Sequence, residues 1–122
     1  MSGFKLSARF KSFGFAFSGL GFMLHTQHNA WLHLLASIVV VMGGFTLRIT
    51  APDWRWLIVA IAMVWVAETF NTAVEYLCDV VSPGFSEAVK RAKDIAAGAV
   101  LLCAISAFFI GALTIFPYLR AT

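Results

Sequence analysis

The sequence predicts an all-α integral membrane protein with three transmembrane helices and an N-terminal amphipathic helix at the membrane surface. Of its 122 residues, 61% are hydrophobic, and the mean hydropathy is +0.86. Only 12% are charged, whereas soluble globular domains are roughly 25% charged. Three stretches are long and apolar enough to cross a bilayer, and the length allows one domain, residues 1–122. This composition excludes an ordinary soluble enzyme, a disordered chain and a disulfide scaffold.

We expect the surface helix over residues 4–24. Apolar side chains recur there at three- and four-residue steps, and polar side chains share another side of the helix. The apolar set is Phe10, Phe13, Phe17, Leu20 and Leu24, and the polar set is Lys5, Arg9 and Ser12. A helix of this kind lies in the membrane interface with its cations among the lipid headgroups. The alternative is a fourth helix packed into the bundle.

The first transmembrane helix is expected at residues 30–48 and the second at residues 55–78. Up to Leu47 the first carries no charged side chain. Between the two helices, residues 48–53 form a short connection in which Pro52 fits a turn. The second helix is long enough to span a bilayer, although it contains two acids and an amide.

The last transmembrane helix is expected at residues 95–118, with Pro117 and Tyr118 marking its end. No charged side chain occurs within residues 95–119, a stretch that easily spans a ~30 Å hydrocarbon core at about 1.5 Å per residue. Residues 79–94 precede this helix as a polar loop and the start of the helix itself.

The distribution of cations predicts which side of the membrane each end occupies. With three spans, the N-terminal segment and residues 79–94 share one side, and that side holds more Lys and Arg than the other. The first set is Lys5, Arg9, Lys11, Lys90, Arg91 and Lys93, and the second is Arg48, Arg55 and Arg120. Because cytoplasmic loops carry the excess of cations, we expect a cytoplasmic N-terminus and an outside C-terminus. The same topology accounts for the pI of about 9.2, so no nucleic-acid partner is expected.

The second span carries a row of polar side chains. Glu68, Asn71 and Glu75 are spaced i, i+3 and i+7, and Asp79 follows at the next four-residue step, so all four share one helix face. An acid inside a membrane helix costs at least about 2.5 kcal/mol on insertion scales and marks a function by default. With the span ending near Cys78, we expect Glu68 to lie ~15 Å inside the membrane.

A second polar group is expected at the entrance of the last span. Lys90, Lys93 and Asp94 are followed by small residues at 96–99, which let helices approach closely and would bring Lys93 and Asp94 against Glu75. Carboxylates together with phosphates suit Mg²⁺, and lysines bind phosphates. A deeper acid could take a proton from a hydroxyl. These are the parts of phosphoryl transfer, in which catalysis is mostly positioning and charge neutralisation.

Three functions remain open on the residues alone. The first is a lipid kinase, although the sequence has no Walker A loop and no kinase Gly-rich loop. The second is a small multidrug-type transporter, in which Glu68 would bind protons or cations. The third is a structural role, in which the acids and cations hold an oligomer together.

The two polar stretches resemble the signature of the prokaryotic diacylglycerol kinase family, which includes the undecaprenol kinases. Residues 68–83 read ETFNTAVEYLCDVVSP, and residues 90–102 read KRAKDIAAGAVLL. The similarity extends to residues 9–13, 16–20 and 29–33 and in effect covers the whole chain. It implies a homotrimer of three-span subunits in the bacterial inner membrane. It also implies MgATP as the phosphoryl donor and a membrane-dissolved lipid alcohol as the acceptor.

The resemblance implies roles for individual residues. Glu68 resembles the general base that takes the proton of the acceptor hydroxyl, and Glu75 resembles the metal-binding carboxylate. Asn71, Lys93 and Asp94 resemble residues that hold the nucleotide phosphates and order the site. Beside this carry-over, the charge of Arg9 makes it a candidate to contact either ATP phosphates or anionic headgroups.

Some positions depart from the family pattern. Gln27 lies where the family often has a second metal-binding Glu, and its neutral amide oxygen can still ligate a metal. Gly84 and Ser86 replace an acid and a His near the nucleotide. Residues 80–83 and 95–102 look nearer the undecaprenol-kinase branch than the diacylglycerol-kinase branch. We expect His25, His28 and His33 to be packing or interface residues, because no Cys or acid joins them at metal-ligand spacing.

Overall fold

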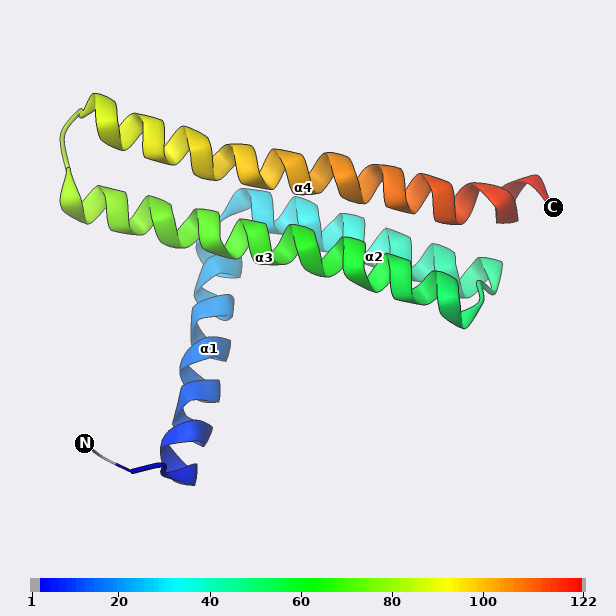
Figure 1. Cartoon of the computed structure of the whole chain (residues 1–122), viewed down its shortest axis with the longest axis horizontal. Coiled ribbons are helices and arrows are strands. Elements are labelled where there is room, and N and C mark those ends of the chain that lie inside the picture. Colours follow the sequence, from blue (N-terminus) through cyan, green and yellow to red (C-terminus); the bar gives the residue numbers. More distant parts are fainter. Residues whose placement is uncertain (1–2, 122) are drawn as a thin grey trace.

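The computed structural model describes residues 3–121, which form four α-helices and no strand (Figure 1). The helices are α1 (Leu6–Thr26), α2 (His28–Leu47), α3 (Ala51–Val81) and α4 (Glu87–Arg120). Three of them, α2, α3 and α4, are long and apolar enough to cross a membrane, which confirms the predicted all-α fold with three spans. The expected domain also includes residues 1, 2 and 122, which lie outside the described residues.

The helices α3 and α4 form a long antiparallel hairpin, and α2 lies beside only part of it (Figure 1). At about 1.5 Å per residue, the 31 residues of α3 and the 34 of α4 extend ~46 and ~51 Å. The 20 residues of α2 extend ~30 Å, the thickness of the hydrocarbon core. All three helices reach the end of the bundle that contains residues 48–50, here called the far end. At the opposite end, called the hairpin end, residues 82–86 join α3 to α4 beyond the reach of α2.

The helix α1 projects sideways from the bundle and contacts it through its C-terminal part (Figure 1). Met23 is buried, and its sulfur lies 3.7 Å from the hydroxyl oxygen of Thr69. The rings of Phe22 and Tyr76 lie 5.3 Å apart. Most other side chains of α1 are exposed. A helix that runs crosswise to three membrane spans would lie along the membrane surface. The direction of α1 therefore supports the predicted surface helix rather than a fourth helix packed into the bundle.

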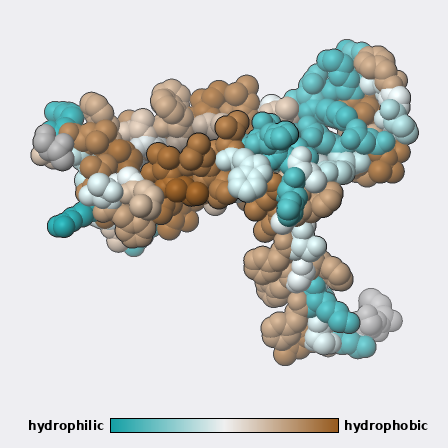
Figure 2. Space-filling model, turned by 180° about the vertical axis from the view of Figure 1, so that it is seen from behind, coloured by the Kyte–Doolittle hydropathy of each residue, from teal (hydrophilic) through white to brown (hydrophobic). Residues whose placement is uncertain are grey.

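The position of α1 bears on the expected depth of Glu68. Because α1 meets α3 at Thr69 and Tyr76, an α1 that lies along the membrane surface would place Glu68 nearer that surface than the ~15 Å predicted from the sequence. The depth of Glu68 stays a prediction. Figure 2 shows the corresponding division of the surface. An apolar band covers the bundle between α1 and the far end, and hydrophilic side chains gather at the hairpin end.

Two prolines lie inside helices, where the sequence predicted a turn and a helix end. Pro52 lies in the first turn of α3, which begins at Ala51. Proline suits this position because the first N–H groups of a helix have no intrahelical acceptor and the fixed φ angle is already helical. Pro117 lies within α4, which continues to Arg120. The cost of the lost backbone hydrogen bond is confined to the last turns of the helix.

Polar contacts fasten the two long helices together at the far end. The Tyr118 hydroxyl of α4 accepts a hydrogen bond from the backbone N–H of Thr50 at 3.0 Å. The same hydroxyl donates a short hydrogen bond to the carboxylate of Asp53 in the first turn of α3. These contacts hold the last turn of α4 beside the start of α3, so the hairpin is tied at both of its ends.

Candidate active site

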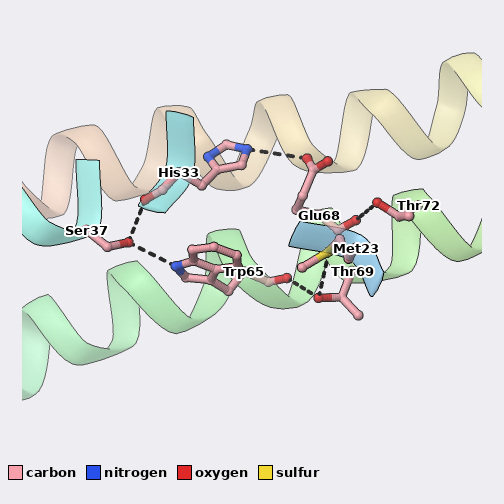
Figure 3. A network of polar contacts seen from close by, with 7 residues as sticks. All are labelled: Met23, His33, Ser37, Trp65, Glu68, Thr69 and Thr72. Carbon is pink, nitrogen blue, oxygen red and sulfur yellow. Dashed lines mark hydrogen bonds and ion pairs between the residues drawn. The ribbon is translucent and has the colours of Figure 1, made fainter. Parts of the chain in front are cut away.

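Glu68 is the one buried acid among the described residues, with an exposed fraction of 1%. Its Oε2 atom lies 3.3 Å from Nε2 of His33 on α2 (Figure 3). Burying a carboxylate without a partner is expensive, and removing one partner from a buried pair leaves an uncompensated charge. The helices α2 and α3 therefore meet where the imidazole lies within ion-pair distance of this carboxylate.

Side chains of α2 and α3 hold His33 in place (Figure 3). The Ser37 hydroxyl donates to the backbone carbonyl of His33 at 2.7 Å and accepts from Nε1 of Trp65 at 2.9 Å. The rings of Trp65 and His33 meet edge-on, with their centroids 6.4 Å apart. These contacts limit how the imidazole can rotate beside Glu68.

Asn71 and Glu75 continue the same face of α3 toward the hairpin end. Asn71 is 8% exposed, and its Oδ1 atom has no hydrogen-bond partner among the described residues. Glu75 is half-buried, and its carboxylate has no hydrogen bond or ion pair within residues 3–121. A buried acceptor left unpaired costs ~1–3 kcal/mol. The site thus contains free oxygen atoms that a ligand would satisfy.

Lys93 of α4 adds a cation to this row. Its Nζ atom lies 2.7 Å from Oδ1 of Asp79 on α3. This hydrogen bond raises the pKa of the Lys93 ammonium group, which lies outside the membrane-spanning part, and the charge of Glu75 acts in the same direction. The sequence predicted both Lys93 and Asp94 against Glu75. Within one chain, Lys93 bonds to Asp79, one turn further along, and the exposed Asp94 pairs with Lys90 of its own helix at 2.8 Å.

The two remaining predicted site residues belong to α1 and its junction with α2. Arg9 lies near the exposed start of α1, with its guanidinium over the ring of Phe4 at 5.8 Å. At about 1.5 Å per residue, it is ~21 Å along the helix from Met23, so it is remote from Glu68 within one chain. Gln27 is half-buried between α1 and α2, and its backbone N–H donates to the carbonyl of Met23 at 2.9 Å. The functional roles of both residues stay predictions.

The residues of this site can be tested for their fit to a metal ion. No group of three His, Cys, Asp or Glu side chains within residues 3–121 forms a metal centre by itself. Mg²⁺ does not require one, because it usually keeps several waters and binds one or two carboxylates and substrate phosphates. The unpaired Asn71 Oδ1 and the free Glu75 carboxylate lie about one turn apart and are ligand atoms of the preferred type. The donor set therefore fits a nucleotide-bound Mg²⁺.

His33 is the part of the site that sequence reasoning missed, since it was expected to be a packing or interface residue. A signal was present, because His33 is the single titratable side chain of residues 30–47. An acid in a membrane helix needs a partner from a neighbouring helix. Choosing His33 as that partner also requires knowing which face of α2 meets α3, and the apolar pattern of α2 does not define that face.

The chain matches known proteins over most of its length. Residues 14–115 match the sequence profile of the family described as prokaryotic diacylglycerol kinase. A protein of Synechocystis sp. named diacylglycerol kinase is 35% identical over 107 residues, which cover 87% of this chain and 61% of that protein. The chain therefore spans less than two thirds of the length of this relative. A Bacillus subtilis protein named undecaprenol kinase is 32% identical over 115 residues, which cover 94% of both chains.

These matches include α2, α3 and nearly all of α4. They therefore cover the helices that carry Glu68, its partner His33 and the polar side chains toward the hairpin end. With its three long apolar helices, the chain is a multi-pass membrane protein, and it belongs to the prokaryotic diacylglycerol kinase family.

Proposed function

We propose that this chain is a membrane lipid kinase that transfers the γ-phosphoryl group of ATP directly to the hydroxyl of a lipid alcohol. The observation that carries the proposal is the buried Glu68–His33 pair, with Asn71 and Glu75 along α3 and Lys93 across the hairpin. The family profile and two relatives named as kinases support it. A transporter that uses Glu68 would need neither Asn71 nor Lys93.

The nucleotide is proposed to bind on the hairpin side of Glu68. Lys93 offers a positive charge to the phosphates, and Asn71 and Asp94 order the groups around them. When bound, Mg²⁺ would supply positive charge that offsets the negative charge developing during transfer. Glu75 would hold this ion, with Gln27 as a neutral second ligand. In this arrangement, each polar side chain of the row helps to place the γ-phosphoryl group.

The acceptor is proposed to approach Glu68 from the membrane. A lipid alcohol presents its hydroxyl at the membrane surface, the level at which α1 meets the bundle. Glu68 supplies the base function that draws the proton from this hydroxyl while the oxygen attacks the γ-phosphorus. General-base help of this kind contributes about 10²–10⁴-fold to the rate, and the rest comes from alignment and charge neutralisation.

Undecaprenol is proposed as the better acceptor and diacylglycerol as the weaker one. The relative named undecaprenol kinase matches over 94% of both chains, whereas the match to the relative named diacylglycerol kinase covers 61% of that protein. Both lipids carry a primary hydroxyl on a long apolar body, so the same base can serve either. In mixed micelles that contain both, we expect a higher kcat/KM for undecaprenol. The opposite order would change the preferred acceptor and leave the kinase assignment standing.

The working assembly is proposed to be a homotrimer in the bacterial inner membrane, with α1 and the hairpin end in the cytoplasm. This orientation would put the cations of residues 5–11 and 90–93 on the cytoplasmic side, as the excess of Lys and Arg on cytoplasmic segments predicts. ATP is available on the same side. Large apolar side chains are exposed along all four helices of the single chain, which leaves surface for both lipid and neighbouring subunits.

The central experiment is phosphoryl transfer in reconstituted vesicles. The purified chain is mixed with undecaprenol or diacylglycerol, Mg²⁺ and ATP labelled in the γ-phosphate. We expect the label to enter the extracted lipid only when Mg²⁺ is present. Labelled inorganic phosphate without labelled lipid would indicate an ATPase. Proton or cation flux without any use of ATP would restore the transporter alternative.

A further inference from the structure

Phe85 is a large apolar side chain without a packing partner at the hairpin end. It lies in the loop of residues 82–86, with 83% of its surface exposed. Its ring has no ring contact with another residue within 3–121. Hydrophilic side chains gather at this end of the molecule (Figure 2), so an exposed phenyl ring here needs a reason.

The usual structural role of an apolar residue at this position is absent. Phe85 immediately precedes Ser86, the N-cap residue of α4. An apolar residue there often packs on the fourth residue of the helix and fixes the angle at which the chain enters it. In this chain the fourth residue is Lys90, whose ammonium group is 2.8 Å from the carboxylate of Asp94. The ring of Phe85 therefore remains available to a ligand.

Insertion into the bilayer does not account for Phe85 either. From Glu68 to Val81, α3 rises ~20 Å toward the loop. If Glu68 lies ~15 Å inside the membrane, as its spacing predicts, the end of α3 is already outside the hydrocarbon. If Glu68 lies nearer the surface, the loop is further out. On either depth, the ring is expected to face water.

The spacing between Phe85 and Lys93 fits a nucleotide. Lys93 is the cation proposed for the phosphates, and α4 rises ~10 Å between Ser86 and Lys93. A ribose separates the phosphates from the base by a distance of this order in an extended nucleotide. With the γ-phosphoryl group directed toward Glu68, the base points toward the hairpin end and reaches the loop that carries Phe85.

The loop offers little with which to read the edge of a base. Its two polar side chains are both engaged locally. The Ser82 hydroxyl donates to the carbonyl of Gly84 at 2.9 Å, and the Ser86 hydroxyl accepts from the backbone N–H of Val89 at 3.4 Å. The remaining loop residues are a proline, a glycine and Phe85 itself. The main surface that the loop presents is thus the face of a phenyl ring.

The charged side chains that flank the loop are already paired. Each has an opposite charge within ion-pair distance, either on its own helix or across the hairpin. The pairs are Glu87–Arg91, Lys90–Asp94 and Asp79–Lys93. Adenine and guanine differ in the donors and acceptors on their edges. A site without unpaired groups aimed at those edges has no means of rejecting one of the two bases strongly.

We propose that Phe85 stacks on the base of the nucleotide and that the site accepts ATP and GTP alike. The inference rests on the lipid kinase function proposed above and broadens its donor to purine nucleoside triphosphates. Stacking on an aromatic side chain is tolerant because every base has a π-face. The bond that breaks, between the γ-phosphorus and the bridging oxygen, and the bond that forms to the lipid oxygen are the same for both nucleotides.

A comparison of nucleotides tests the lack of base selectivity. Lipid phosphorylation is measured with ATP and with GTP, each labelled in the γ-phosphate, at saturating lipid. We expect the two values of kcat/KM to agree within about tenfold, whereas a site that hydrogen-bonds one base edge would separate them by ~10⁴-fold or more. A preference greater than about tenfold for either purine would overturn the inference.

Variants of Phe85 test the stacking itself. Phe85→Ala should raise the KM for ATP and for GTP by roughly tenfold or more, with little change in kcat at saturation. Phe85→Trp keeps an aromatic face and should have a KM at or below that of the wild type. Val80→Ala removes another exposed apolar side chain near the loop, one that is 79% exposed, and is the matched control with an unchanged KM. An unchanged KM in Phe85→Ala, or an equal rise in Val80→Ala, would contradict stacking.

A binding measurement separates this inference from the kinase function. On illumination, 8-azido-ATP should label the peptide that contains residues 82–86 in the wild-type oligomer, and ATP and GTP should compete equally. Labelling should be weaker in Phe85→Ala. If this pattern is found but the wild type phosphorylates no lipid, the kinase proposal fails and the stacking site stands. Labelling confined to other segments, or loss of the oligomer in Phe85→Ala, would assign the ring to another role and overturn the inference.

Discussion

Single residues of the site carry charge in a place where burial makes charge costly. Glu68 is 1% exposed and has His33 as its partner. Glu68→Gln keeps the shape and a hydrogen-bond acceptor but removes the charge. We expect lipid phosphorylation to fall by about 10²–10⁴-fold, with the helix content and oligomer size unchanged. Transfer of labelled phosphate, circular dichroism and size-exclusion chromatography in detergent measure these three quantities. Wild-type turnover in a folded variant would remove Glu68 from the mechanism.

The metal requirement is also a property of single residues. The Glu75 carboxylate has no hydrogen bond or ion pair among the residues that the structure describes. Glu75→Ala should therefore raise the Mg²⁺ concentration needed for half-maximal activity or abolish activity, since phosphates cannot dock beside carboxylates without a bridging cation. Gln27→Glu adds a negative charge at the position of the second ligand and should lower that concentration. A Mg²⁺ titration of each variant provides the test. An unchanged curve for Gln27→Glu would show that this position does not face the ion.

Sequence spacing predicted one half of the site better than the other. The polar row was predictable because i+3 and i+4 steps define one face of a helix, and Asn71 and Glu75 do follow Glu68 along α3. The contact with His33 was not predictable, because it depends on how α2 is rotated against α3. Asp94 shows the same limit. Its spacing fits either α3 or its own helix, and within one chain it bonds to Lys90.

At the scale of helices, the approach of α2 to α3 at the far end depends on one glycine. A Cβ atom on Gly44 would lie 2.6 Å from Cη2 of Trp54, whereas one on Gly43 would meet nothing within 4 Å. The Trp54 ring also packs on Phe45, with centroids 4.8 Å apart. Gly44→Ala should therefore destabilise the bundle by ~1–3 kcal/mol through overpacking. Gly43→Ala should be neutral or stabilising, because alanine is the better helix former.

Thermal unfolding in one detergent compares the two glycine variants directly. The Gly44→Ala variant should have the lower Tm, and the Gly43→Ala variant a Tm equal to or above that of the wild type. Equal shifts would mean that the Trp54 ring moves aside at no cost. Only the structure gives this prediction, because two adjacent glycines look equivalent in the sequence.

The hairpin of α3 and α4 offers a second comparison between variants. Asp79→Asn and Lys93→Met both break the ion pair between these helices, but only the second removes the charge proposed for ATP phosphates. Exposed ion pairs add little to stability, so both variants should keep a Tm close to that of the wild type. The KM for ATP should rise clearly only in Lys93→Met. A similar rise in Asp79→Asn would mean that Lys93 must be held by Asp79 to reach the nucleotide.

For the whole molecule, helix lengths determine what lies inside the membrane. The composition predicted three spans, and α2 has the length of one bilayer core. The sequence analysis assigned the extra length of α3 and α4 partly to the connecting segments 48–53 and 79–94. It could not locate the helix ends, because helix propensity and hydropathy continue across the membrane surface without a break. The crosswise direction of α1 offers a reference level, and from it we expect Lys93 and Asp79 to lie outside the hydrocarbon. The hairpin end is therefore expected to be accessible to water and to labelling reagents.

Single cysteines can test this arrangement in a background of Cys78→Ala and Cys103→Ala. Phe85 lies in the hairpin loop with 83% of its surface exposed, and Ala121 is exposed just after α4. A membrane-impermeant maleimide should label Phe85→Cys only in inverted membrane vesicles and Ala121→Cys only in intact spheroplasts, because the cations of residues 90–93 favour the cytoplasm. The reverse labelling pattern would place the hairpin end on the side of the membrane without ATP. That result would contradict a nucleotide site at the hairpin end.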